Sequence, residues 1–225
     1  MDLQLADRVI LVVGGTGLIG RAVGDLLRAE GAVVVAAARG EGADVRLDGA
    51  DPASVDAAVA RVLADHGRID GLVVTAAPPA QTLDPARAGD PEQVAQAFEA
   101  KAMTFLRVAN AVVPAMREAG TGRIVGVSGQ NARLSGSITA AVRNAGVTIA
   151  AQSLADELAG TGVAVNVVDP GPVVASPASQ VEHGRPGESS PEQVARLVVF
   201  LLSPANAISS EAVAVGHRVR GVVSV

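Results

Sequence analysis

Three glycines near the N-terminus have the spacing of a phosphate-binding turn. Gly14, Gly17 and Gly20 lie in "VVGGTGLIG", between an apolar run and a segment with helical spacing. One glycine lets the chain turn tightly, another lets the backbone approach a pyrophosphate, and the helix start supplies N–H donors and a positive dipole end. The pattern predicts a dinucleotide site, and a turn with a purely structural purpose is the alternative.

The residue that follows the second apolar run bears on which dinucleotide would bind. A protein that reads NAD places a carboxylate there, where it accepts hydrogen bonds from the ribose hydroxyls. In this chain the run ends at Ala38 and Arg39 follows. Because a guanidinium pairs with a 2′-phosphate through charge-assisted hydrogen bonds, we expect NADP(H). A solvated arginine is the alternative, and Asp48 either faces the adenine or caps a loop.

The glycine turn and Arg39 lie in an alternation of apolar runs and helical segments. Uninterrupted apolar runs are typical of strands buried on both faces of a parallel sheet. The first helical segment repeats apolar residues on one face, at Leu18, Ala22, Leu26 and Ala29. Strands joined by helices predict an α/β fold, a Rossmann-type doubly wound parallel sheet in a single domain, residues 1–225. The strands are expected at 8–15, 32–39, 69–77, 122–128, 162–173 and 211–216.

Composition argues against several classes of function. Aromatic residues make up 1% of the chain, with no Tyr or Trp, and the net charge is -5, so nucleic-acid binding is not expected. There is no cysteine, and three scattered histidines form no metal site. No apolar run reaches the ~20 residues of a membrane span, and the start "MDLQLADR" is too polar for a signal peptide. We therefore expect a cytoplasmic protein without membrane, nucleic-acid or metal partners.

Taken together, these segments resemble the short-chain dehydrogenase/reductase family from about Leu5 to about Val215. "VVPAMREAGTGRIVGVSG" resembles the helix and strand that lead to the catalytic serine of that family. "SLADELAGTGVAVNVVDPGPV" resembles its helix, strand and Pro-Gly turn, and "GGTGLIG" is similar to the glycine motif of its extended members. The resemblance and the turn imply cofactor contacts from Gly14, Thr16, Gly17, Leu18, Ile19, Gly20, Arg39, Asp48, Ala76, Ala77, Pro170, Gly171 and Val173.

The active site that the resemblance implies departs from the pattern of the family, which uses Asn, Ser, Tyr and Lys. Ser128 stands at the serine position, and Lys101 stands where the family has its Asn. Counting back from Asn166, which matches the Val-Asn strand of the family, puts Asn144 at the Lys position and Ala140 at the Tyr position. Since the chain contains no tyrosine, no other register restores it. Ser128, Lys101 and Asn144 remain as candidate catalytic residues.

The loss of the tyrosine has a chemical consequence. Positions 140 and 144 face the same side of a helix, so a Tyr and a Lys there share a cleft, and the ammonium lowers the pKa of the phenol. The phenol then protonates the carbonyl oxygen as hydride arrives, which an alanine cannot do. A positioned general acid is worth ~10²–10⁴ in rate, so we expect poor reduction of simple ketones. A substrate that already carries positive charge, such as an iminium, needs mainly positioning.

Three functions remain open. The first is an atypical NADP(H)-dependent oxidoreductase that transfers hydride to a small electrophilic organic substrate. In it Ser128 would bond a substrate oxygen, Lys101 would offer a positive donor, and the Asn144 amide oxygen would orient Lys101. The second is a catalytically inactive dinucleotide-binding homologue, a sensor or a partner subunit, and the third is a non-redox cyclase or isomerase. A solvated Lys101 and a Ser128 that serves only local backbone are the alternatives for these side chains.

The resemblance also implies association into a homo-oligomer, a dimer or a tetramer. Members of the family commonly pair their subunits through two long helices, which correspond here to residues 91–118 and 139–160. The alanines of the second helix would allow close approach of a partner, or would pack on the sheet instead. A polar, irregular segment, Ser176–Ser190, is a candidate flap over the site.

Overall fold

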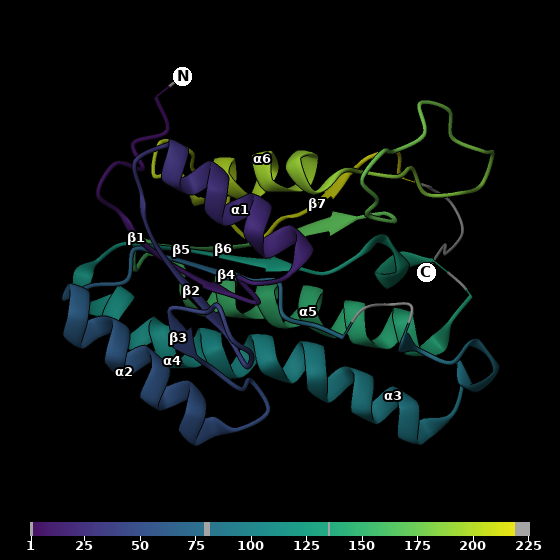
Figure 1. The fold of residues 1–225 in the computed structure, drawn as a ribbon, viewed down its shortest axis with the longest axis horizontal. Coiled ribbons are helices and arrows are strands. Elements are labelled where there is room, and N and C mark those ends of the chain that lie inside the picture. The colour runs from purple at the N-terminus through teal and green to yellow at the C-terminus, as the bar shows by residue number, and fades with distance from the viewer. Residues whose placement is uncertain (1, 79–81, 135, 219–225) are drawn as a thin grey trace.

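Parallel strands form one sheet in the computed structural model, which describes residues 2–78, 82–134 and 136–218 (Figure 1). Their order is β3-β2-β1-β4-β5-β6-β7, so the chain proceeds outward from β1 in one direction and from β4 in the other. This reversal leaves a crevice at the carboxyl ends of β1 and β4, where doubly wound sheets bind ligands. The predicted fold class is confirmed. The strands are β1 (Val9–Val13), β2 (Val33–Ala38), β3 (Val45–Arg46), β4 (Gly71–Val74), β5 (Gly122–Val127), β6 (Val163–Pro170) and β7 (Ala212–Val215).

Helices cover both faces of the sheet. They are α1 (Leu18–Ala29), α2 (Pro52–His66), α3 (Pro91–Phe98), α4 (Thr104–Ala119), α5 (Ile138–Glu157) and α6 (Pro191–Leu202). Shorter helical turns are η2 (Pro85–Arg87), η3 (Glu99–Met103) and η4 (Gln130–Arg133). α1 and α6 pack on one face, and α2, α4 and α5 pack on the other. Within the described residues, no helix combines the length and apolar character needed to cross a membrane.

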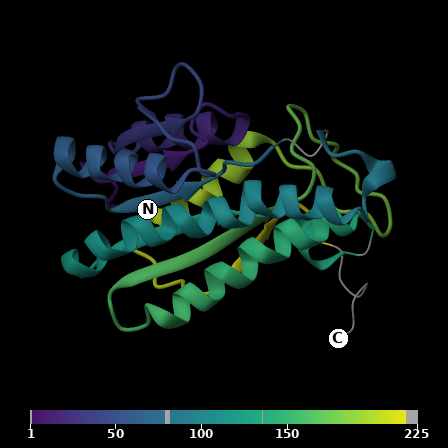
Figure 2. The same ribbon diagram turned by 90° about the horizontal axis from the view of Figure 1, so that it is seen from below.

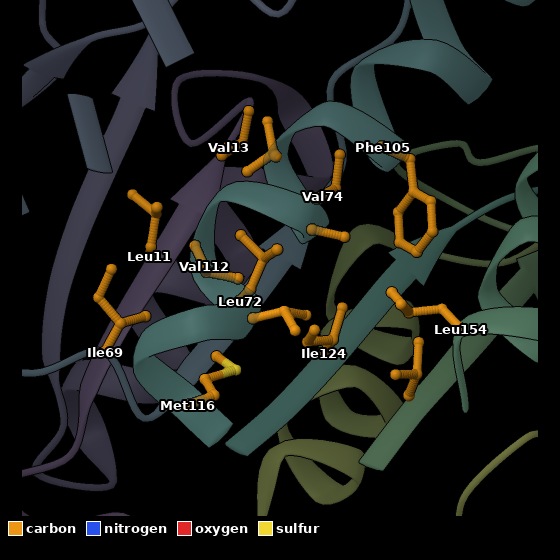
Figure 3. Close-up of a cluster of buried hydrophobic side chains, with 14 of the residues drawn as sticks. Leu11, Val13, Ile69, Leu72, Val74, Phe105, Val112, Met116, Ile124 and Leu154 are labelled. Carbon is orange, nitrogen blue, oxygen red and sulfur yellow. The ribbon is translucent and has the colours of Figure 1, made fainter. Parts of the chain in front are cut away.

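The core consists mainly of branched aliphatic side chains. On one face of the sheet, Leu11, Leu72 and Ile124 of neighbouring strands join a cluster with Val112 and Met116 of α4 (Figure 3). On the other face, alternate strand residues pack in a second cluster with α1 and α6. Because the central strands are covered on both faces, both of their side-chain rows are apolar, which explains the uninterrupted runs in the sequence.

The helix expected at 91–118 is interrupted by a π-helical turn. Asp90 caps its start by accepting hydrogen bonds from the backbone N–H groups of Glu92 and Gln93, at 2.9 and 3.0 Å. The π-helical turn, η3, separates α3 from α4, and this helical run lies beside α5 (Figure 2). Such turns are frequent at functional sites. Here the turn carries Lys101 into the protein interior, where it is 8% exposed.

The buried face of α1 differs from the prediction. The structure buries Val23 and Leu27 together with Gly20 and Gly24, whereas Leu18 is 62% exposed. A Cβ at position 20 would lie 2.2 Å from the Gly14 carbonyl oxygen, so glycine is required where the helix crosses the turn. The apolar repeat was misleading because it leaves out glycine, while this helix approaches the sheet partly through Gly20 and Gly24.

β3 was not predicted, because it contains two residues and has no apolar run. Residues 39–44 alone connect it to the parallel strand β2, although such crossovers usually take a dozen or more residues. Asp44 holds the connection: its backbone N–H donates to the Ala36 carbonyl and its carboxylate accepts from the Ala36 N–H, both at 2.8 Å. The edge of the sheet beside Arg39 is therefore a short loop rather than a helix.

Candidate active site

The three glycines of the first turn meet different surroundings. Gly14 has a φ of +83°, and a Cβ there would lie 2.6 Å from the Thr75 Oγ1. A Cβ at Gly20 would meet the Gly14 carbonyl, as described above. At Gly17, by contrast, an added Cβ would find one neighbour within 4 Å, the Gly14 oxygen at 3.2 Å. Gly14 and Gly20 are thus required by close packing, whereas Gly17 borders open space at the start of α1.

The start of α1 is suited to an anion. Gly17 is the N-cap residue, and no side chain caps the helix. The first N–H groups of a helix that lacks a cap are available to a ligand, and the helix dipole favours negative charge there. Thr16 and Ile19 are half-buried beside this end. The residues present therefore fit the pyrophosphate of a dinucleotide.

Other predicted cofactor residues lie at the carboxyl ends of the neighbouring strands. Ala76 and Ala77 follow β4 and are half-buried, and Pro170 and Gly171 lie at the end of β6. Val173 forms an isolated bridge with Ser189, which ties the Pro-Gly turn to the end of the candidate flap. Sequence analysis missed Thr75. Its hydroxyl lies 3.1 and 3.2 Å from the carbonyls of Val13 and Gly14, so it joins β4 to the glycine turn.

Arg39 and Asp48 differ in how the protein uses them. Arg39 is exposed directly after β2 and makes no hydrogen bond or ion pair with any residue that the structure describes. Its guanidinium is therefore available to a phosphate. The Asp48 carboxylate accepts a hydrogen bond from the Ala50 N–H at 3.1 Å, and the Asp48 N–H donates to the Ser54 Oγ at 3.0 Å. Asp48 thus caps the loop before α2.

Lys101 is the centre of a buried polar cluster. Its Nζ donates hydrogen bonds to the Ser128 carbonyl at 2.8 Å and to the Asn144 Oδ1 at 2.6 Å. The alternative of a solvated lysine is wrong, and the contact through the amide oxygen has the form that sequence analysis expected. Three elements meet at this point: η3, the end of β5 and α5.

The environment of Lys101 favours its neutral form. Burial lowers its pKa from 10.5 to about 7, with help from the positive charge of Arg143 and opposition from Asp169. The ammonium has three N–H groups, of which two are donated to carbonyl oxygens. Near neutral pH, Lys101 therefore exchanges a proton readily and has one N–H left for a further acceptor.

The Ser128 hydroxyl points into the protein. It donates to the Asn144 carbonyl at 2.9 Å and lies 3.3 Å from the Thr148 Oγ1, and Ser128 is 5% exposed. The hydroxyl thus satisfies the backbone of α5 rather than the local backbone that sequence analysis held as the alternative for Ser128. The next residue faces the cluster instead, since a Cβ at Gly129 would lie 3.1 Å from the Asn144 Nδ2.

Two charged residues near Lys101 were missed by sequence analysis. Asp169, at the end of β6, is 2% exposed, and its Oδ1 has no hydrogen-bond partner among the described residues. Burial raises its pKa, against the lowering effects of Arg133, Arg218, Ser128 and Lys101. Its signal in the sequence is the single charged residue of a mostly apolar strand, directly before the Pro-Gly turn.

The second missed residue is Arg143 on α5. It is 5% exposed, and burial lowers its pKa. Its Nη1 donates to the Pro78 carbonyl at 3.2 Å, while its Nε has no hydrogen-bond partner among the described residues. Its signal is a single cation in the Ala-rich helix directly before Asn144.

A cavity of about 440 Å³ lies at the start of α5. It includes Ala140, the position where the resemblance implies a tyrosine, which contributes a methyl group. The cavity is lined by Leu83, Asp84, Pro85, Ala88, Asn131, Gly136, Ser137 and Ala140. A second cavity, of about 260 Å³, adjoins the glycine turn between α1 and β2 and has Arg21 and Asp44 among its charged lining residues. The described residues therefore leave room for ligand groups at the start of α5 and beside the glycine turn.

Solved structures share this architecture. The crystal structure of gox2181 superposes with a TM-score of 0.81 at 25% identity, covering 95% of this chain and 96% of that one. Ligand-free aldohexose dehydrogenase from Thermoplasma acidophilum gives a TM-score of 0.80 at 20% identity, covering 96% and 94%, a likeness of fold alone.

Sequence comparisons identify the family. The family model described as enoyl-(acyl carrier protein) reductase matches residues 17–216. The chain is 30% identical to 3-oxoacyl-(acyl-carrier-protein) reductase FabG of Escherichia coli strain K12 over an alignment of 228 residues, which covers 89% of this chain and 92% of the relative. It is also 30% identical to D-threitol dehydrogenase of Mycolicibacterium smegmatis over an alignment of 236 residues, which covers 92% of this chain and 90% of the relative. The chain therefore belongs to the short-chain dehydrogenase/reductase family of oxidoreductases.

Proposed function

We propose that this chain is an NADP(H)-dependent oxidoreductase that acts on a small electrophilic organic substrate, with Lys101 in place of the tyrosine acid. The observation that carries the proposal is the state of Lys101. It is buried at the carboxyl end of the sheet, bonded to Ser128 and Asn144, and has a pKa of about 7. A group with a pKa near the working pH is well matched to proton transfer.

The glycine turn and Arg39 support the cofactor assignment. The N–H groups at the start of α1 would bind the pyrophosphate, and the Arg39 guanidinium would pair with a 2′-phosphate. The Thr75 hydroxyl, directly after β4, donates to the Gly14 carbonyl and so holds the glycine turn. Gly171 directly follows β6. When bound, the nicotinamide cofactor supplies or accepts the hydride.

Lys101 would act through the N–H that its two carbonyl acceptors leave unused. As hydride reaches a carbonyl or imine carbon, the adjacent oxygen or nitrogen gains an electron pair and needs a proton or a positive neighbour. Lys101 Nζ can hold that proton, while the Asn144 Oδ1 and the Ser128 carbonyl fix the direction of the amine. Ser128 acts as a positioning residue in this scheme, because its hydroxyl holds the Asn144 carbonyl.

Cofactor titration tests the proposal. Because the chain has no Trp or Tyr, its own near-ultraviolet emission is very weak and NADPH fluorescence can be followed directly. We expect NADPH to bind more tightly than NADH, and Arg39→Ala to remove the difference. Arg46→Ala is a matched control, since Arg46 is also an exposed arginine at this edge of the sheet. If neither nucleotide binds at millimolar concentration, the proposal is wrong.

Turnover tests the role of Lys101. With NADPH bound, we expect reduction of imines and activated ketones, and a rate that declines as pH rises through about 7, where Lys101 loses its proton. Lys101→Met should lower the rate by ~10²-fold or more, in the range of a positioned general acid, and should flatten the pH profile. A variant that keeps both the wild-type rate and the pH dependence would contradict the assignment.

A second candidate is a dinucleotide-binding protein without turnover. Two observations favour it: Ala140 offers a methyl group in place of an acid, and the Ser128 hydroxyl is bonded within the protein. Tight NADPH binding without hydride transfer to ketones, imines or enones would support this candidate over the oxidoreductase.

A further inference from the structure

Arg143 is a buried cation without an acidic partner. The residue is 5% exposed to solvent. No carboxylate among the described residues lies within ion-pair distance of it. Its Nη1 donates one hydrogen bond, to the Pro78 carbonyl, and its Nε has no partner among the described residues. Most of the five N–H donors of the guanidinium are therefore left for other acceptors. Since a buried charge is normally paired, the guanidinium needs an anion that the described protein does not supply.

A second cation lies close by. The charge of Arg143 is one of the causes that lower the pKa of Lys101, so the two side chains interact electrostatically in the interior. The charge of Asp169, on β6, acts on Lys101 in the opposite sense, but burial raises the pKa of Asp169 and so disfavours its charged form. The charged groups around Lys101 therefore have an excess of positive charge.

A cavity adjoins the helix that carries Arg143 and Asn144, although neither residue is among those that line it. Ala140 lies one helical turn before Asn144 on α5 and lines the cavity of about 440 Å³. Pro78, which accepts from Arg143, precedes the segment that supplies Leu83 and Asp84 to the same cavity. A ligand in this cavity thus lies within one helical turn of Arg143 and Asn144 along the helix.

We propose that Arg143, beside Lys101, binds a carboxylate group of the substrate, so that the substrates are small oxo or imino acids. This inference rests on the proposed oxidoreductase function, which supplies the electrophilic centre. The planar guanidinium matches a carboxylate through two parallel hydrogen bonds, a geometry that an ammonium lacks. The same donors could bind a phosphate of the cofactor, and the experiment distinguishes the two sources.

Anion binding is coupled to the protonation of Lys101. A carboxylate beside Arg143 offsets the positive charge that disfavours the ammonium, so Lys101 takes up a proton when the anion binds. Titration calorimetry of the wild-type protein in two buffers of different ionisation enthalpy measures this uptake directly. We expect net proton uptake between about pH 7 and pH 9, and no uptake in Lys101→Met.

The binding test uses pyruvate, malonate and acetate as carboxylate probes, and methyl pyruvate as a neutral analogue. We expect Arg143→Gln to weaken binding of the carboxylates by about 10- to 100-fold, as the loss of a charged hydrogen-bond partner implies, and to leave methyl pyruvate nearly unchanged. Arg143→Lys should recover part of the affinity, which also guards against a folding defect in the Gln variant. Arg117→Gln, an exposed arginine in the last turn of α4, is the matched control and should bind as the wild type does.

The outcomes separate this inference from the proposed function. If Arg143→Gln loses NADPH affinity but binds the carboxylates unchanged, the anion site belongs to the cofactor and the inference is wrong. It is also wrong if no carboxylate probe binds the wild type at millimolar concentration, or if no proton is taken up. If carboxylates bind through Arg143 while NADPH does not bind at all, the anion site stands and the oxidoreductase function falls.

Discussion

At the scale of single residues, the chemistry of the site depends on charges that have been removed from water. Lys101, Arg143 and Asp169 are all nearly inaccessible, and burial shifts each of them toward its neutral form. A tyrosine is absent, yet a proton-exchanging amine is bonded to Asn144, one helical turn from Ala140, the position where the resemblance implies the tyrosine. Each shift also predicts how stability depends on pH.

For Lys101 the dependence has a definite sign. Its pKa is 10.5 in the unfolded reference and about 7 in the folded protein, so the unfolded chain binds more protons between these values. Stability contributed by this group therefore rises with pH from about 7 to about 10.5. We expect the stability of the wild type relative to Lys101→Met to increase across this window by up to about 5 kcal/mol, measured by urea unfolding. A constant difference would show that Lys101 is not buried as a titrating group.

Asp169 gives the opposite dependence. Burial raises its pKa above the usual 3.8, so the folded state binds more protons within the window between the two values. The contribution of Asp169 to stability is therefore lost as pH rises through that window. Asp169→Asn, which keeps the shape without the charge, should be more stable than the wild type at neutral pH and should lose that advantage in acid. Thermal unfolding at several pH values measures this, with the exposed Asp25→Asn as control.

At the scale of elements, different glycines of the strand-turn-helix at the N-terminus serve folding and cofactor binding. Gly20 is required for packing, because its Cβ would lie 2.2 Å from a carbonyl oxygen, whereas Gly17 borders the open start of α1. We expect Gly20→Ala to destabilise the fold by about 1–3 kcal/mol, the range for overpacking. Gly17→Ala has an allowed φ of -79° and should leave the melting temperature nearly unchanged while it weakens NADPH binding.

Thermal unfolding and NADPH fluorescence of the same two variants test this separation. Gly67→Asn provides a control outside the turn, since Gly67 ends α2 in the left-handed conformation that Asn tolerates and has no neighbour within 4 Å of an added Cβ. If Gly17→Ala and Gly20→Ala lose stability equally, the assignment of separate roles is wrong.

At the scale of the whole molecule, the outer face of α5 points to association. Ile138, Val142 and Ile149 are 55%, 38% and 62% exposed on a helix that lies beside α4. We propose that this face pairs with a second copy of the chain. Ile149→Glu should reduce the oligomer to a smaller species in sedimentation velocity, because a charge cannot be buried unpaired at low cost. Val181→Glu, an exposed apolar residue in the candidate flap, should sediment as the wild type does.

Part of the site could be predicted from the sequence, because counting along the chain needs no knowledge of burial. The register placed Lys101, Ala140 and Asn144 at related positions, and the structure brings Lys101 and Asn144 into contact. The same counting could not show that the Ser128 hydroxyl points into α5. Arg143 and Asp169 were missed because a charged side chain in a sequence is ordinarily solvated, and only burial makes it unusual.

The sequence by itself determined the α/β class, the locations of the strands other than β3, and the glycine turn, because these depend on local periodicity and on backbone conformations that neighbouring residues impose. The tertiary structure alone decided which face of α1 is buried, that β3 follows β2 without a helix, and that Lys101 has a pKa of about 7. Those properties depend on close approach between distant segments and on the exclusion of water. Neither is encoded in the spacing of residues along the chain.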